Sequence, residues 1–210
     1  MSTSTGTMER PVRPLHLWSL REDVAVDVAP GELTLTADGA TVRLDRPDPI
    51  VVETVRRMEL GPVLLANAHG PATGGPADEA DVLSQVLPAL RRCATLVVRT
   101  LGLDDLGGPL LSVTPVGDAA LSAPMSPAEG RLRMALGLAL VFRRSSVLLE
   151  ADWANYRVEI HRPEVMWVVG LLAWPTTADA LCAAVALPTE VTRGILAYLK
   201  AAEFVAAVPD

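Results

Sequence analysis

The residues best suited to metal binding or nucleophilic chemistry in this sequence are three histidines and two cysteines, His16, His69, His161, Cys93 and Cys182. A protein zinc site needs several Cys, His or carboxylate ligands at close spacing, and none of the histidines has such neighbours. The cysteines lie far apart in apolar, helix-like contexts, which predicts buried free thiols in a reducing cytoplasm. His161 ends a strand or begins a helix. The pattern therefore indicates no metal site.

Motifs for phosphate binding and acyl transfer are also missing from the sequence. The glycine-rich residues 70–75 lack the Lys-Ser/Thr pair of a phosphate-binding loop and are not flanked by a strand and a helix. No Gly-x-Ser-x-Gly occurs, and the paired carboxylates Asp104 and Asp105 lie in a turn, where solvation is their simplest role. We therefore expect no catalytic residues, and a chain that is not an enzyme by itself.

The charge of the chain argues against nucleic acids as partners. Its 210 residues carry a formal net charge of −7, and Lys200 is the only lysine. DNA-binding proteins neutralise phosphates with clustered Lys and Arg, whereas the arginines here are scattered in pairs. The longest apolar run, residues 165–174, is half the roughly 20 residues that a membrane span needs. Residues 1–8 lack the features of a signal peptide. We expect a cytoplasmic protein without nucleic-acid or membrane partners.

Residues 143–208 predict one small module of mixed α and β structure. Two short apolar runs around the turn-prone Asp152 and Asn155 indicate a β-hairpin. Pro163 and Glu164 suit the first turn of a helix, which Pro175 stops. The expected elements are strands 147–151 and 156–160, helices 165–174, 176–185 and 189–202, and a closing strand 204–208. A hairpin followed by three helices and a strand is a winged-helix arrangement.

The first half of the chain repeats this order. Asp38-Gly39 is a strong two-residue hairpin signal. Residues 42–47 (Val-Arg-Leu-Asp-Arg-Pro) align with residues 158–163 (Val-Glu-Ile-His-Arg-Pro), so that in both a strand ends in Arg-Pro and a helix begins. The remaining elements are expected to be strands within 15–44, helical segments 50–58, 61–67 and 81–93, and a strand 96–100. We infer a tandem duplication.

The predicted fold class is therefore α+β, with two tandem winged-helix-like units, each a small antiparallel sheet plus three helices. We expect a disordered tail (1–14), a first unit (15–116) that ends in a strand at 110–116, a linker (117–130) and a second unit (131–210). Residues 132–142 are expected to give the first strand of the second sheet, with a helix as the alternative because Ala and Leu dominate there. Pro88 should kink the third helix of the first unit.

Several segments resemble the N-terminal region of SagB/ThcOx-type dehydrogenases, and the likeness covers nearly all of residues 15–210. Their combination is more specific than any one of them. The segments are Leu17-Trp18-Ser19-Leu20-Arg21-Glu22-Asp23-Val24, Val42-Arg43-Leu44, Arg57-Met58, Leu60-Gly61-Pro62-Val63, Leu96-Val97-Val98-Arg99-Thr100-Leu101-Gly102-Leu103, residues 108–116, residues 156–163 and Ala197-Tyr198-Leu199.

The enzymes of that family oxidise azolines to azoles in ribosomally made peptide natural products, using FMN. Their FMN-binding nitroreductase-like domain follows the matching region, whereas the present sequence ends at Asp210. The resemblance therefore implies no cofactor in this chain, with FMN held by a partner or by a missing catalytic domain. The chain would be a split protein or a domain of a longer one.

The winged-helix units also resemble the PqqD-like elements that recognise precursor peptides in such pathways. An element of that kind captures the leader peptide as an added strand, so that main-chain hydrogen bonds supply affinity and side-chain pockets supply selectivity. The implied partners are the precursor leader peptide and an FMN-dependent dehydrogenase domain, a YcaO-type cyclodehydratase, or both. A homodimer is a further option.

The resemblance places the peptide site on strand 156–161 and helix 189–202 of the second unit. Alternate strand residues face opposite sides of the sheet, and two basic helix residues would meet acidic leader residues. The expected binding residues are Tyr156, Arg157, Val158, Glu159, Ile160, Arg193, Leu196 and Lys200.

Two other functions compete with a non-catalytic leader-peptide recognition or docking module. A winged-helix DNA-binding regulator needs basic and amide side chains on its third helix, where residues 189–200 offer only Arg193 and Lys200. A dimerisation or assembly scaffold without a peptide site would leave an apolar patch on one wing and no pocket between strand and helix.

Overall fold

The computed structural model describes residues 12–68, 79–105, 107–117, 119–121 and 130–208 of the chain. Most of the expected tail (1–14) and linker (117–130) therefore lies outside the described residues. Within them the chain forms antiparallel sheets and several helices, which confirms the predicted α+β class.

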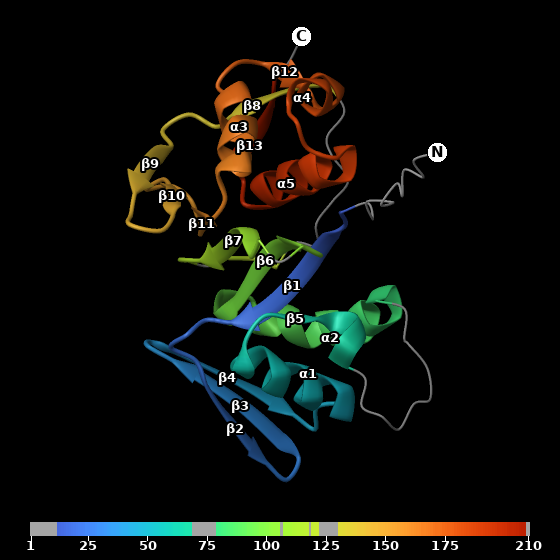
Figure 1. The fold of residues 1–210 in the computed structure, drawn as a ribbon. Helices are drawn as coiled ribbons and strands as arrows, with labels where there is room; N and C mark the ends of the chain where they lie inside the picture. The colour runs from blue at the N-terminus through green and yellow to red at the C-terminus, as the bar shows by residue number, and fades with distance from the viewer. Residues whose placement is uncertain (1–11, 69–78, 106, 118, 122–129, 209–210) are drawn as a thin grey trace, which may run out of the picture.

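The largest sheet has seven strands in the order β5-β1-β6-β7-β11-β10-β9, with every neighbouring pair antiparallel. Strands β1, β6 and β7 lie between two groups of helices, α3–α5 on one side and α1–α2 on the other (Figure 1). The strands are β1 (Pro14–Leu20), β5 (Val63–Leu64), β6 (Val97–Leu103), β7 (Pro109–Pro115), β9 (Ala139–Phe142), β10 (Val147–Glu150) and β11 (Tyr156–Ile160).

Two smaller sheets have three strands each, in the orders β2-β3-β4 and β12-β8-β13. Their strands are β2 (Ala25–Ala29), β3 (Glu32–Ala37), β4 (Ala40–Asp45), β8 (Arg131–Met134), β12 (Thr176–Thr177) and β13 (Val205–Val208). The helices are α1 (Pro49–Leu60), α2 (Glu79–Arg92), α3 (Pro163–Leu171), α4 (Ala178–Ala184) and α5 (Thr189–Ala201), with 3-10 turns η1 (Leu65–Ala68) and η3 (Ala94–Leu96).

The two halves of the chain have the same order of elements, except that the second half has helix α4 where the first half has the 3-10 turn η1. In the first half β1 is followed by the meander β2-β3-β4, helix α1, the short strand β5, helix α2 and strand β6. In the second half β8 is followed by β9-β10-β11, α3, β12, α4, α5 and β13. The pairings agree as well, because β1 lies between β5 and β6 as β8 lies between β12 and β13. Strand β4 is therefore the counterpart of β11, and α2 the counterpart of α5.

The expectation that each unit has its own separate sheet is wrong, because β7 joins the two halves. It pairs with β6 of the first half on one side and with β11 of the second half on the other. Strands β6 and β7 also contribute five side chains to the hydrophobic core of the second half, which are Leu101, Leu103, Leu110, Leu111 and Val113. A boundary at residues 117–130 thus cuts one continuous sheet and one shared core.

Two local expectations also differ from the structure. Residues 132–142 do not form one strand, since they divide into β8 and β9 of different sheets around a turn in which Gly137 adopts φ 78°. Residues 61–67 form the short strand β5 and a 3-10 turn in place of a helix. Pro88 lies inside α2.

The Arg-Pro junctions start both matching helices. In the first half Asp48 caps α1 by accepting a hydrogen bond from the backbone N–H of Ile50, 2.9 Å away. In the second half Arg162 donates to Asp105 at 3.0 Å and to Glu164 at 2.7 Å. These charge-assisted bonds lower the pKa of both carboxyls and fasten the start of α3 to the β6–β7 turn.

Candidate functional site

The peptide site predicted on the second unit is not open, because β11 is an inner strand. It lies between β7 and β10, so neither of its edges is free. Its residues Tyr156, Val158 and Ile160 are buried in the core of the second half, together with Leu196 of α5. Strand addition at β11 is therefore excluded, since an added strand needs unpaired N–H and C=O groups.

The charged residues predicted for that site mostly have partners within the chain. Arg157 forms an ion pair with Glu150 at 3.1 Å, and Arg193 forms one with Asp179 at 3.2 Å. The carboxylate of Glu159 accepts a hydrogen bond from Ser146 Oγ at 2.6 Å. Lys200 lies half-buried in the last turn of α5. The structure does not gather these groups around a free strand edge.

Strand β7 occupies the position where the leader peptide was expected. The backbone N–H of Val116 donates to Asn155 O at 3.0 Å, and that of His161 donates to Leu110 O at 2.9 Å. In this register the hydrogen-bonding groups of alternate residues Arg157, Glu159 and His161 point toward β7. The chain thus fills the edge of β11 with an antiparallel strand of its own.

The counterpart edge, on β4, is free within the described residues. Ala37 and Ala40 flank the two-residue turn Asp38-Gly39, and Arg46 N donates to Gly31 O at 2.7 Å. In this register every second residue of β4 directs its N–H and C=O groups toward β3. The residues between them direct their N–H and C=O groups outward. The outward residues are Thr41, Arg43 and Asp45, which the sequence alignment matches to Arg157, Glu159 and His161.

A side chain from α2 confirms which way the β4 edge faces. Arg92, in the last turn of α2, donates from Nη2 to the carbonyl oxygen of Arg43 at 2.7 Å. Gln85 and Ala89 lie on the same face of α2 by helical spacing. The side chains of Arg43, Arg46 and Arg92 are exposed beside this edge. Arg43 lies 4.0 Å from the carboxylate of Glu32, and Asp45 is exposed on the same edge, so the arginines exceed the carboxylates by one.

We call the outward residues Thr41, Arg43 and Asp45, together with Arg92, the β4 edge site. The position of the β4 edge site could be found from the sequence, because the Arg-Pro alignment matches residues 42–47 to residues 158–163. It could not show which of the two equivalent edges is covered. That depends on the pairing of β7 with β11, whose partners lie more than forty residues apart in the chain.

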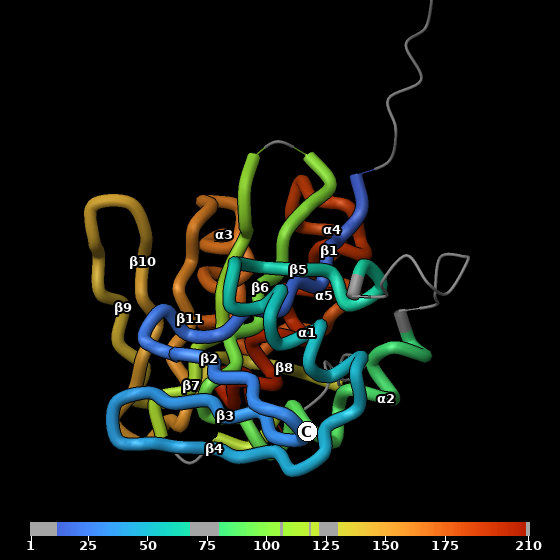
Figure 2. The backbone as a smooth tube through the Cα atoms, turned by 90° about the horizontal axis from the view of Figure 1, so that it is seen from below, coloured from blue at the N-terminus to red at the C-terminus, as the bar shows by residue number. Residues whose placement is uncertain are grey.

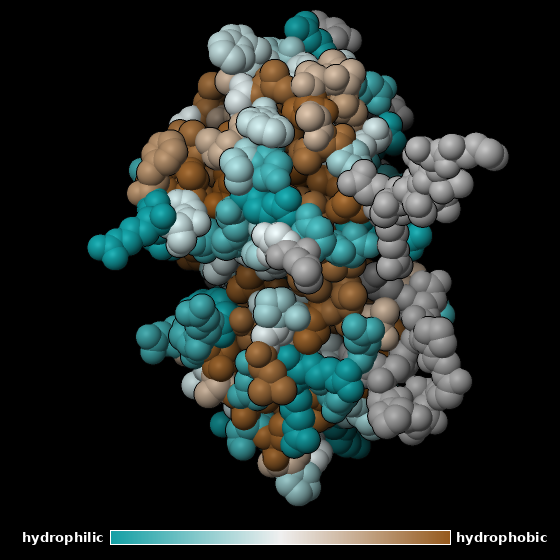
Figure 3. All heavy atoms as spheres, in the orientation of Figure 1, coloured by the Kyte–Doolittle hydropathy of each residue, from teal (hydrophilic) through white to brown (hydrophobic). Residues whose placement is uncertain are grey.

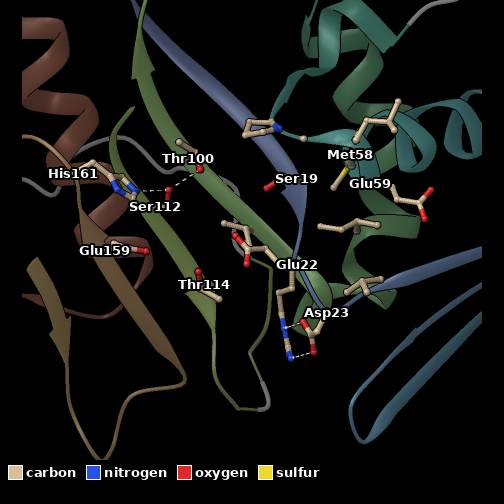
Figure 4. A pocket seen from close by; sticks show the side chains of 17 residues that line it. Ser19, Glu22, Asp23, Met58, Glu59, Thr100, Ser112, Thr114, Glu159 and His161 are labelled. Carbon is tan, nitrogen blue, oxygen red and sulfur yellow. Dashed lines mark hydrogen bonds and ion pairs between the residues drawn. The ribbon is translucent and has the colours of Figure 1, made fainter. Parts of the chain in front are cut away.

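A second feature is a polar cleft of about 630 Å³ on the face of the large sheet (Figure 4). Its floor carries hydroxyl groups from neighbouring strands, and the β1–β2 turn and the end of α1 form its other walls. Ser112 Oγ lies 2.9 Å from Thr100 Oγ1 and 3.0 Å from His161 Nε2. Further lining residues labelled in Figure 4 are Ser19, Glu22, Asp23, Met58, Glu59, Thr114 and Glu159.

The Ser112–His161 pair resembles half of a nucleophilic triad but lacks the rest. A triad needs a third group that orients the histidine and donors that stabilise an oxyanion. No carboxylate of the described residues hydrogen-bonds the other ring nitrogen of His161. Glu22, Glu59 and Glu159 bring carboxylates to the cleft, and Arg21, which pairs with Asp23, brings a guanidinium. Among the described residues the cleft thus holds a Ser–His hydrogen bond without the other groups of a triad.

Burial gives His161 a pH-dependent role in stability. Desolvation lowers the pKa of its ring below 6.5, while the charge of Glu159 opposes the shift. The folded state therefore resists protonation, so this contribution to the free energy of unfolding is complete above pH 6.5 and is lost as the pH falls below it. Urea unfolding at about pH 7.5 and about pH 5.5 should show a larger loss for wild type than for His161→Gln. Equal losses would contradict this role.

Neither a metal cluster nor a membrane-spanning helix occurs in the described ranges. Within the described ranges no three His, Cys, Asp or Glu side chains are grouped so that they could hold a metal ion. None of the helices in those ranges is long and apolar enough to cross a membrane. No protein-family model matches the chain, and no curated protein matches it either.

Proposed function

We propose that this chain is a non-catalytic peptide-docking module, which binds an extended segment of a precursor peptide as a strand added to β4. One observation carries the proposal. The edge of β11 holds an added strand, β7, while the equivalent edge of β4 has no strand beside it among the described residues. The chain thus contains an internal example of strand addition at one of two matching positions.

The β4 edge site defines the chemistry of the bound peptide. Its outward N–H and C=O groups would pair with the peptide main chain, as Arg157, Glu159 and His161 pair with β7. Arg43 and Arg92 would favour a peptide with acidic side chains, and Arg92 already occupies one outward carbonyl. The guanidinium of Arg92 must therefore move from the Arg43 carbonyl or share it with the peptide.

The resemblance to azoline dehydrogenases suggests what the peptide does. It would be the leader of a ribosomally made precursor in the cytoplasm, whose core is modified by a YcaO-type cyclodehydratase and an FMN-dependent dehydrogenase domain. Holding the leader raises the effective concentration of the core at those enzymes without any chemistry in this chain. FMN would belong to the dehydrogenase domain.

A DNA-binding role is less well supported by the structure. Its α5, the third helix of the second unit, faces the core with Val191, Ile195, Leu196 and Leu199. The two basic residues of that helix are Arg193, which is paired with Asp179, and Lys200. A recognition helix needs free basic and amide side chains for phosphates and base edges.

Selection from a displayed peptide library tests the proposal without knowledge of the natural precursor. Peptides of about twelve random residues would be selected on the immobilised full chain and then counter-screened on the Arg43→Pro variant. We expect the selected peptides to be extended, to contain Asp or Glu, and to bind wild type only. Peptides that bind both proteins equally well would place the site elsewhere.

A further inference from the structure

Among the described residues, strand β9 forms a free and apolar edge of the seven-stranded sheet. It lies at the outer side of the molecule (Figure 2), and brown, apolar atoms gather where Figure 1 draws it (Figure 3). Its sequence is Ala-Leu-Val-Phe, and Leu140, Val141 and Phe142 are 41%, 39% and 75% exposed. Exposed edge strands normally carry charges, prolines or bulges that prevent pairing with another chain. β9 has none of these, in contrast to β4.

The hydrogen-bonding register shows which groups of β9 are available. Arg143 N donates to Ser146 O at 2.9 Å across the β9–β10 turn. Hydrogen-bonded and non-hydrogen-bonded pairs alternate along an antiparallel ladder, so Val141, two residues before Arg143, directs its N–H and C=O groups toward Leu148 of β10. Leu140 and Phe142 therefore direct theirs outward. Two donors and two acceptors with this spacing can pair with an antiparallel copy of the same strand.

We propose that β9 pairs with β9 of a second copy of this chain, antiparallel and centred on Val141. In this register Leu140 of each copy exchanges both backbone hydrogen bonds with Phe142 of the other. Val141 lies opposite Val141 of the second copy, on the two-fold axis. The contact is isologous and closes as a dimer, with one sheet that runs through both molecules.

A pocket beside β9 that contains the carboxylate of Asp152 favours a second copy over an unrelated strand. The pocket measures about 290 Å³, and its lining includes Ala139, Glu150, Asp152 and Arg157. Arg157 pairs with Glu150 at 3.1 Å, whereas Asp152 forms no ion pair within the described residues. In the proposed register Arg143 of the second copy lies opposite Ala139, on the sheet face that carries Glu150. Neighbouring strands are about 4.8 Å apart, so the arginine can extend over the Ala139 methyl group to the carboxylates. No ion pair of Arg143 is found within the described part of the chain.

The small size of the edge predicts a dimer that dissociates on dilution. A four-residue strand buries less surface than a standard stable interface, which covers about 800 Å² on each partner. Sedimentation velocity of the full wild-type chain over a range of concentrations should show a reversible monomer–dimer equilibrium. A wild-type chain that stays monomeric at the highest concentration overturns the proposal.

Charge variants test the predicted contacts of the dimer. Phe142→Lys and Arg143→Glu should each weaken dimerisation at least tenfold. Asp152→Arg should restore it in the Arg143→Glu background, because the two charges exchange places across the interface. Leu136→Lys and Arg144→Glu are the matched controls, since both residues are exposed and lie outside β9, and both should dimerise as wild type. Weakening by the controls equal to that of the test variants would refute the register.

Disulfide formation tests the two-fold axis independently. Val141→Cys, in a Cys182→Ser background, should form a covalent dimer rapidly under mild oxidation, because opposite residues of a non-hydrogen-bonded pair have Cβ atoms about 4.5–5.5 Å apart. Leu140→Cys should cross-link much more slowly, since it lies opposite Phe142. The native Cys93 is buried and should not interfere. Equal cross-linking of the two variants would show that the strands do not pair in this way.

Discussion

Residues 130–210 expressed without the first half should not fold. They would lose β7, the neighbour of β11, and the five side chains that β6 and β7 add to the core of the second half. Each large buried apolar side chain contributes about 1.5–3 kcal/mol, so five of them are comparable to the whole stability of a domain, about 5–15 kcal/mol. Circular dichroism with urea should show no cooperative transition for this fragment.

A longer fragment provides the control for this result. Residues 96–210 retain the β6–β7 hairpin, and should recover a cooperative transition, although β6 then loses its pairing with β1. A cooperative transition of residues 130–210 alone, at the same urea concentration as the intact chain, would show an independent second domain. That outcome would contradict the shared sheet and core.

Arg43→Pro should weaken peptide binding at least tenfold, while Arg43→Ala should weaken it much less. Proline removes the outward N–H of residue 43 and places its ring where the peptide must approach, whereas alanine keeps the N–H. A backbone hydrogen bond contributes about 0.5–1.5 kcal/mol net, and the steric clash adds to this loss. Fluorescence polarisation with a labelled library-selected peptide measures both affinities.

The folded state should tolerate both substitutions at Arg43. Proline is found on edge strands where its missing N–H faces solvent, as the N–H of Arg43 does. Thermal unfolding should therefore place both variants close to wild type. Equal affinity of both folded variants for the peptide would remove the β4 edge from the binding site.

Local sequence signals predicted much of this fold. Asp38-Gly39 gives the tight β3–β4 hairpin, and the apolar spacing of Val191, Ile195 and Leu199 gives the buried face of α5. The Arg-Pro junctions mark the starts of α1 and α3. Each of these features is decided by residues close together in the chain, so sequence patterns can reveal it.

Pairings between distant strands could not be predicted in this way. Leu110 and Val113 indicate that β7 is a strand, but nothing in its sequence selects β11 as its neighbour. For the same reason the sequence led us to expect a free edge on β11, which the structure does not have. Tyr156 and Ile160 have the pattern of a strand, and only the assembled sheet shows that both of its edges are covered.

Amide hydrogen exchange, followed residue by residue by NMR, tests the β4 edge site most directly. On addition of a selected peptide, the outward amides of Thr41, Arg43 and Asp45 should become protected, because each gains or approaches a main-chain partner. Those of Val42 and Leu44 face β3 and should change little. Protection of this alternating kind on β4 is the result we predict. Peptide binding that leaves all three outward amides exchanging at their original rates would contradict the proposed function.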